Sequence, residues 1–175
     1  RHWHPFIRDT ITKMKEDGIR EAIALIMAPH QSSAATGGYV ADVEDALKTT
    51  DGVPDITFAK PWHTEPLFIE AVVQNLRDTL KESSKEKTLV IFTAHSLPIN
   101  MLKHDPYVPS ILETIAEVIK NIPLDWRLSY QSKGHGPIEW LGPSVEETIS
   151  AAKDADYEAI AIAPLGFVSD HIETL

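Results

Sequence analysis

The stretch from Thr88 to Pro98, TLVIFTAHSLP, organises the rest of the sequence. Leu89 to Phe92 form an unbroken apolar run that is too short for a buried helix and rich in strand-forming residues. This pattern is typical of a strand covered on both faces of a parallel sheet. His95 and Ser96 follow directly. We therefore expect an imidazole at the carboxyl end of a central strand, where open α/β sheets form their ligand crevices.

A second apolar run, near the end of the sequence, leads to another group of polar residues. Residues 159–163 predict a strand, and Asp170, His171 and Glu173 follow at the start of a predicted helix. Because parallel strands end at the same edge of a sheet, we expect these side chains to approach His95. Asp170 with Glu173 three residues later also fits a capping box, which is the structural alternative. Two carboxylates and an imidazole exceed what a cap needs, so the pattern favours a functional site.

Segments of helix and strand type alternate along the chain and are joined by short loops. The sequence predicts helices over residues 5–17, from the small polar segment after 30 to about 47, and over 65–82, 106–121 and 144–155. It predicts strands over 22–28, 56–59, 126–131 and 159–163, and a central strand built on the run 89–92 and stopped by Pro98. This alternation is typical of βαβ units, so the predicted fold class is α/β with parallel sheets flanked by helices. The segment 61–66, with a proline at each end, is the expected boundary between two such sheets.

Local signals refine several of these elements. Residues 22–28 read as a buried strand. Asp105 before Pro106 predicts a helix start with the Asp as N-cap. Ser144 with Glu147 three residues later predicts a capping box. Four apolar residues share one predicted face of the helix over 65–82, namely Phe68, Val72, Leu76 and Leu80.

Composition excludes several classes of function. The net charge of −10, with no basic cluster, argues against a nucleic-acid partner. The chain has no cysteine, so disulfides, thiolate zinc sites and iron–sulfur clusters within it are excluded. Neither a Gly-rich dinucleotide motif nor a P-loop occurs. No apolar run approaches the ~20 residues that cross a bilayer, so we expect a cytoplasmic protein. The chain opens with Arg1 rather than Met, and we expect it to be part of a longer protein.

Several residues have a structural and a functional interpretation. His95 alone could be a structural histidine or a ligand for Fe(II) and a proton acceptor near neutral pH. Ser96 reads as a turn residue, because no GxSxG elbow surrounds it. Trp140, in a loop rich in Gly and Pro, is either a core plug or a flat wall for an aromatic ligand. Four other histidines beside prolines or charges are predicted on the solvated surface: His2, His4, His63 and His104.

Four motifs resemble those of ferrochelatases. They are FTAHSLP at 92–98, DPY at 105–107, YQSKGHGPIEWLGP at 130–143 and PLGFVSDHIETL at 164–175, and a weaker match extends back to RHWHPF at 1–6. The resemblance implies a chelatase fold, with residues 1–60 as the end of one Rossmann-like domain and 61–175 as most of a second. It implies insertion of ferrous iron into a porphyrin during heme synthesis.

The resemblance also assigns site residues. The metal-binding and catalytic positions of the family fall on His95 and Glu173, and supporting positions on Asp170, His171 and Trp140. A mixed imidazole–carboxylate site would bind Fe(II) and still release it, and a neutral imidazole would accept a pyrrole proton.

Substrate-binding residues are expected at Tyr39 and Ser96. Pro29-His30 followed by Tyr39 resembles relatives that use coproporphyrin III, with protoporphyrin IX as the alternative. Some relatives hold an iron–sulfur cluster near the segment where Ser32 and Ser33 stand here. We expect no such cluster and no cofactor beyond the substrate iron.

Other functions remain open at this point. The chain could be a non-catalytic module that binds porphyrin or metal, or a chelatase for another metal such as cobalt. A storage module would need neither a proton acceptor nor an open metal position, so His95 with Glu173 favours the enzyme. We expect a monomer with porphyrin and ferrous iron as partners, and leave peripheral membrane contact open. We expect this chain alone to turn over poorly, because the family's first strands and its C-terminal segment are missing.

Overall fold

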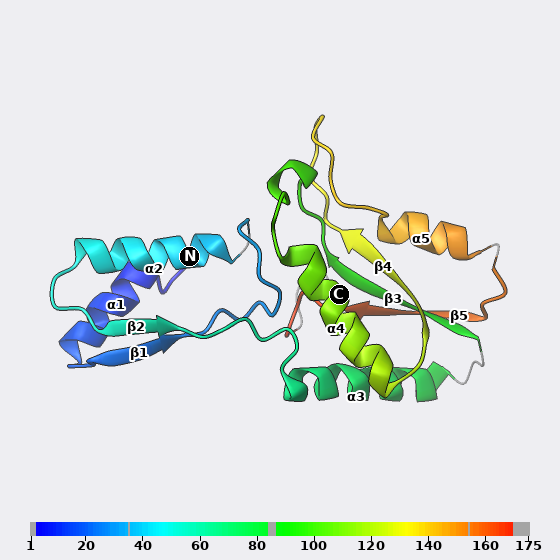
Figure 1. Ribbon diagram of the computed structural model, residues 1–175, viewed down its shortest axis with the longest axis horizontal. Coiled ribbons are helices and arrows are strands. Elements are labelled where there is room, and N and C mark those ends of the chain that lie inside the picture. The colour runs from blue at the N-terminus through cyan, green and yellow to red at the C-terminus, as the bar shows by residue number, and fades with distance from the viewer. Residues whose placement is uncertain (1–2, 35, 84–86, 154, 170–175) are drawn as a thin grey trace. The chain divides into compact units, whose positions relative to one another are not determined.

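The computed structural model describes residues 3–34, 36–83, 87–153 and 155–169. The chain divides into two compact units, Arg1–Pro61 and Trp62–Leu175. Each unit is built from parallel strands and flanking helices, as the sequence predicts (Figure 1). Within the described residues, no helix combines the length and the apolar character that crossing a bilayer requires.

The first unit holds two strands and two helices in alternation. Its elements are α1 (Ile7–Glu16), β1 (Glu21–Ala24), α2 (Gly37–Thr49) and β2 (Asp55–Phe58). The two strands pair in parallel from Glu21↔Asp55 to Ala24↔Phe58. Helices α1 and α2 pack together around a small core of Ile11, Val43 and Ala46.

The prediction of a buried strand over residues 22–28 is wrong in both length and burial. β1 ends at Ala24, and Ile23 within it is 76% exposed. Leu25 and Met27, beyond the strand, are also exposed. In the described part of the chain, β1 pairs only with β2, and the exposure of its residues alternates. An apolar run cannot tell whether one or both faces of its sheet are covered.

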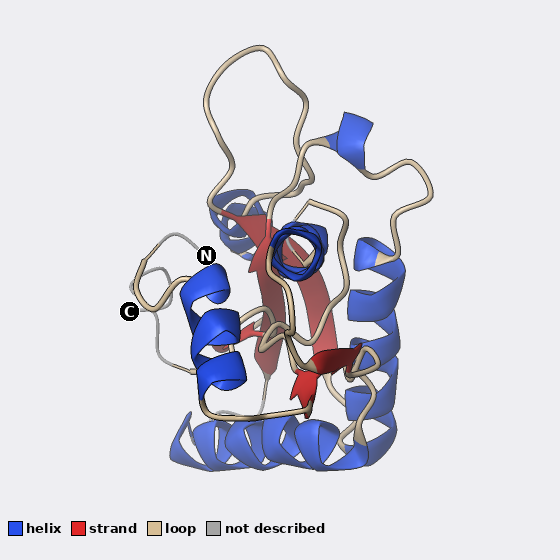
Figure 2. Cartoon of the chain, turned by 90° about the vertical axis from the view of Figure 1, so that its left-hand side faces the viewer, coloured by secondary structure: helices blue, strands red, loops and turns tan. Residues whose placement is uncertain are grey.

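The second unit contains the sheet predicted from the opening motif. Its elements are α3 (Pro66–Ser83), β3 (Thr88–His95), the 3-10 turn η1 (Ile99–Met101), α4 (Tyr107–Asn121), β4 (Asp125–Gln131), α5 (Val145–Ala152) and β5 (Ala159–Pro164). The strand order is β4-β3-β5, and both pairings are parallel. The prediction of a central strand is therefore confirmed. The loop that carries η1 and the long loop after β4 extend past the same end of the sheet (Figures 1 and 2).

Strand β3 lies at the centre of the core of this unit. Each residue from Leu89 to Phe92 is at most 1% exposed. Leu89 and Ile91 pack against Ala152 of α5. Successive side chains of a strand alternate between faces, so Val90 and Phe92 point to the opposite side. Coverage of both faces explains why this strand reads as a continuous apolar run.

Two helix predictions need correction in detail. The buried residues of α3 are Ile69, Val73 and Leu76, whereas Phe68, Val72 and Leu80 are only partly buried. The buried stripe is thus rotated by about one residue from the predicted face. Helix α5 ends at Ala152, earlier than predicted. Its start is confirmed, because a complete capping box of Ser144 and Glu147 is present.

Candidate functional site

His95 is the last residue of the central strand β3. On one side it pairs with Gln131, the last residue of β4. On the other side the pairing with β5 stops two residues earlier, at Thr93↔Pro164. Its side chain is neither buried nor fully exposed. The predicted position of an imidazole at the carboxyl end of a central strand is confirmed.

Hydrogen bonds hold the backbone around His95 from both sides. The Ser96 N–H donates to the Gln131 carbonyl at 2.7 Å, and the Tyr107 hydroxyl donates to the His95 carbonyl at 2.9 Å. Ser96 is fully buried, and its hydroxyl donates to the Leu141 carbonyl at 2.8 Å. This geometry supports the turn interpretation of Ser96 and gives no support to a substrate contact by its side chain.

The segments HSLP and WLGP lie side by side. Pro98 and Trp140 form an antiparallel bridge. The bridge is flanked by the bond from Ile99 N to the Glu139 carbonyl, at 2.9 Å, and by the bond from Leu141 N to the Leu97 carbonyl, at 3.0 Å. Two motifs that are some forty residues apart in the sequence are thus joined directly beyond the end of β3.

Trp140 packs closely on the backbone of its own loop. A Cβ atom placed on Gly134 would lie 2.4 Å from Cζ2 of the indole, so only glycine allows this approach. The indole Nε1 is buried, with no hydrogen-bond partner among the described residues. Part of the ring is therefore covered, as in the core-plug interpretation. The residue as a whole is partly exposed, so the second interpretation, a wall for an aromatic ligand, stays open.

Tyr107 links the start of α4 to the end of β3. Asp105 Oδ1 accepts a hydrogen bond from the Tyr107 N–H at 2.9 Å, so Asp105 does cap the start of this helix. The predicted start is one residue early, because α4 begins at Tyr107 with Pro106 at its N-cap position. Tyr107 is 6% exposed, and burial raises the pKa of its phenol well above the ordinary range. Burial also raises the pKa of Tyr130 on β4. The Tyr107 hydroxyl therefore remains protonated and able to donate at every physiological pH.

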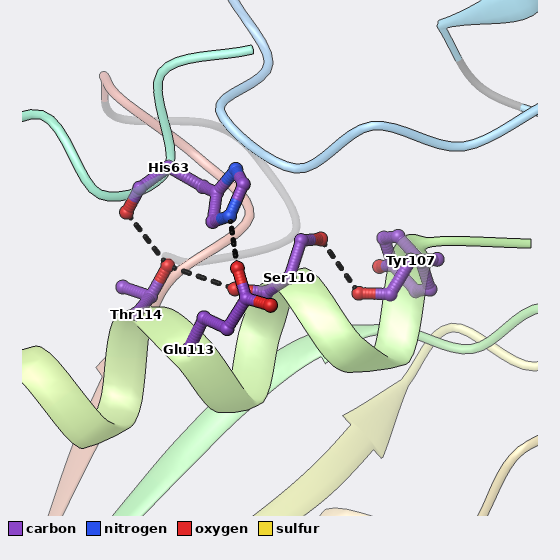
Figure 3. Close-up of polar contacts among 5 residues, drawn as sticks. All are labelled: His63, Tyr107, Ser110, Glu113 and Thr114. Atoms are coloured by element: carbon purple, nitrogen blue, oxygen red, sulfur yellow. Dashed lines mark hydrogen bonds and ion pairs between the residues drawn. The ribbon is translucent and has the colours of Figure 1, made fainter.

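His63 departs from its predicted surface position. Its side chain is 16% exposed, and its Nε2 lies 2.8 Å from Oε2 of Glu113 on α4 (Figure 3). The Thr114 hydroxyl donates to the His63 carbonyl at 2.8 Å. His4 and His104 are exposed as predicted, and His2 lies outside the described residues.

Several predicted site residues cannot be placed together with His95. Asp170, His171 and Glu173 lie outside the described residues, so their approach to His95 stays a prediction. Within the residues described, no group of three or more His, Cys, Asp and Glu side chains is arranged to hold a metal ion. Tyr39 is 41% exposed and lies on α2, in the first unit. Its substrate-binding role also stays a prediction.

Sequence reasoning assigned Tyr107 only to a helix start and did not single out Gly134. The DPY motif, whose tyrosine lies twelve residues after His95, is visible in the sequence, but nothing in its pattern shows that the phenol reaches the strand end. Gly134 lies six residues before Trp140, and this spacing alone does not indicate that the indole turns back onto it.

Comparison with known proteins agrees with the motifs and the fold. A family model described as Ferrochelatase matches residues 1–175. The chain is 36% identical over 182 residues to a ferrochelatase of Deinococcus radiodurans, covering 100% of this chain and 58% of that protein. It is 37% identical over 179 residues to a coproporphyrin III ferrochelatase of Halalkalibacterium halodurans, covering 100% and 57%. A ferrochelatase of Thermus thermophilus is 34% identical over 176 residues, with 99% and 56% covered.

The chain thus spans somewhat more than half the length of these curated relatives. The motifs, the parallel sheets and the match over all 175 residues agree with one another. This chain belongs to the ferrochelatase family.

Proposed function

We propose that the protein inserts ferrous iron into a porphyrin during heme synthesis, with His95 and Glu173 binding the metal and accepting the pyrrole protons. Family membership supports the reaction class. The single observation that carries the role of His95 is its position: a partly exposed imidazole on the last residue of the central strand. This is where parallel α/β sheets place their ligand sites.

The reaction makes two demands that an imidazole and a carboxylate can meet. Fe(II) must exchange water for ligands that hold it and then release it to the porphyrin, and mixed nitrogen and oxygen ligands suit that exchange. Two pyrrole N–H protons must also leave the macrocycle. A neutral imidazole accepts a proton near neutral pH, so His95 is the proposed acceptor. Glu173 would share the metal or pass protons towards Asp170 and His171.

The backbone around His95 is held in place, as suits a residue that must return its side chain to the same position in every catalytic cycle. Hydrogen bonds from Tyr107 and to Gln131 hold the peptide group after His95. The loop beyond it is bridged to the segment that carries Trp140. Catalytic groups work best on such rigid supports, because misplacement by about 1 Å costs on the order of 100-fold in rate. We propose Trp140 as a wall for the macrocycle, through the part of its ring that the loop does not cover.

For the substrate, we propose coproporphyrin III first and protoporphyrin IX second. The Pro29-His30 pair followed by Tyr39 supports this order. The relative from Halalkalibacterium halodurans, named a coproporphyrin III ferrochelatase, supports it too. Since the chain has no cysteine, we propose no iron–sulfur cluster held by this segment. A cytoplasmic location and a monomeric state stay predictions.

Porphyrin fluorescence under anaerobic conditions tests this function, because insertion of iron quenches the emission. The full-length protein should metalate coproporphyrin III, and His95→Ala should lower kcat by on the order of 100-fold or more. His104→Asn is the matched control. His104 is exposed and has a φ of 65°, a conformation that Asn tolerates. Metalation by His95→Ala at the wild-type rate would remove the proposed base. Tight porphyrin binding without any metalation would instead support a storage module.

A further inference from the structure

The hydroxyl of Tyr107 bonds to the backbone of β3 just beyond the point where β5 stops pairing with that strand. The pairing of β3 with β5 ends at Thr93↔Pro164. The next residue, Leu165, donates its N–H to the Thr93 carbonyl at 2.9 Å. Carbonyls of alternate residues on a strand point to the same edge, so the His95 carbonyl faces the edge that β5 no longer lines. There it accepts a hydrogen bond from Tyr107 Oη at 2.9 Å.

The same peptide group is held at its other end by β4. The N–H of Ser96 donates to the Gln131 carbonyl at 2.7 Å. Because a peptide group is planar, fixing its C=O and its N–H fixes the orientation of the whole unit. Tyr107 and Gln131 together determine the position from which the imidazole projects.

Tyr107 is itself firmly placed. Its N–H donates to Asp105 Oδ1, and its carbonyl accepts from the Ser110 hydroxyl at 2.8 Å (Figure 3). One turn further along α4, the Thr114 hydroxyl donates to the carbonyls of Ser110 and His63 at 3.1 and 2.8 Å. Tyr107 as a whole is 6% exposed. A buried ring on a helix anchored in this way can deliver its hydroxyl to one place with little freedom.

We infer that Tyr107 is a positioning residue for the chemistry of His95, acting through the carbonyl at the end of β3. The inference rests on the proposed metal-binding role of His95. Tyr107 is buried, and among the described residues its hydroxyl bonds to the backbone of His95, so its contribution is to orient the metal ligand and not to contact the porphyrin. Loss of the hydroxyl should therefore weaken metal binding and slow metalation while leaving porphyrin affinity unchanged.

The test compares Tyr107→Phe with Tyr157→Phe in the full-length protein. Tyr157 is a partly buried tyrosine of the same unit that packs near α5. Its change to Phe therefore controls for the loss of a phenolic hydroxyl elsewhere in the unit. Zn(II) affinity is measured by calorimetry, and kcat and KM by the fluorescence assay with coproporphyrin III. We expect Tyr107→Phe to lower Zn(II) affinity and kcat on the order of tenfold, with KM unchanged. Tyr157→Phe should match the wild type in all three.

A second readout detects the hydrogen bond directly. With histidine labelled at its carbonyl carbon, the ¹³C resonance of His95 should move upfield in Tyr107→Phe and stay in place in Tyr157→Phe. A purely structural role for Tyr107 would lower the denaturation midpoint and still move the His95 resonance, but would leave Zn(II) affinity and kcat as in the wild type. That result overturns the inference.

Failure of this inference can be told apart from failure of the proposed function. If His95→Ala loses activity while Tyr107→Phe retains it in full, only the positioning role is wrong. If His95→Ala itself retains Zn(II) binding and metalation, the function proposed for His95 is wrong, and the inference falls with it.

Discussion

Replacing Gly134 with alanine should damage the loop that carries Trp140. The new Cβ atom would stand 2.4 Å from Cζ2 and 2.9 Å from Cη2 of the indole. Carbon atoms in contact need about 3.5 Å, so the ring would have to move by about 1.1 Å. The backbone cannot supply this movement easily, because bonds to Leu97 and Ile99 hold it on both sides of Trp140. The indole must therefore leave its rotamer or the loop must open.

The expected cost follows from two opposing effects. Overpacking of this kind destabilises a folded state by about 1–3 kcal/mol. Replacing glycine by alanine restricts the unfolded chain and returns about 0.4–1 kcal/mol. We predict a net decrease of about 1–2 kcal/mol in the free energy of unfolding, measured by urea denaturation with circular dichroism and tryptophan fluorescence. The near-UV spectrum of the folded variant should also change, since the ring moves.

Two controls make the Gly134 prediction specific. A Cβ on Gly142, in the same loop, would meet no described atom within 4 Å, so Gly142→Ala should change stability by no more than about 0.5 kcal/mol. In a Trp140→Ala background, Gly134→Ala should lose its cost, giving a coupling energy of about 1–2 kcal/mol. Equal stability of the two glycine variants, or an undiminished cost in the Trp140→Ala background, would refute the close packing.

Three further predictions concern stability. Ser144→Ala removes the capping box of α5 and should cost about 1 kcal/mol in thermal or urea unfolding; no change would show that the box is not stabilising. Thr148→Val leaves the fully buried Ser129 hydroxyl, 2.6 Å from Thr148 Oγ1, without this partner, and should cost about 1–3 kcal/mol. Ser129→Ala should cost less, and the reverse order would contradict this reasoning. Burial raises the pKa of Tyr107 above that of the unfolded chain, so the unfolded state binds fewer protons above pH ~10. This contribution is fully present below pH ~10 and is lost as the pH rises further. Tyr107→Phe should therefore flatten the alkaline decline in stability, and an equally steep decline would count against the burial effect.

Features that depend on neighbouring residues in the sequence were predictable. The run from Leu89 to Phe92 predicts a strand buried on both faces, and each of these residues is at most 1% exposed. The cap of Ser144 with Glu147 is equally local, since both partners lie within one helical turn. The position of His95 at the strand end follows from the same run and from the polar residues after it.

Features that depend on tertiary partners were not predictable. Ile23 belongs to an apolar run but is 76% exposed, because no described residue packs over it. Whether such a run is buried depends on segments far from it in the sequence. His63 is predicted on the surface from the prolines and charges beside it, and its contact with Glu113, fifty residues away, is not visible in that local pattern. The role of Tyr107 arises because β5 diverges from β3 just before His95, and no periodicity encodes that divergence.

X-ray absorption at the zinc edge tests the central claim, that His95 is a ligand of the metal, most directly. The full-length protein and its His95→Ala variant would each be loaded with one equivalent of Zn(II). The wild type should show nitrogen and oxygen ligands at about 2.0–2.1 Å with the multiple scattering of an imidazole. The variant should show one imidazole fewer. Identical imidazole scattering in the two samples would contradict the claim.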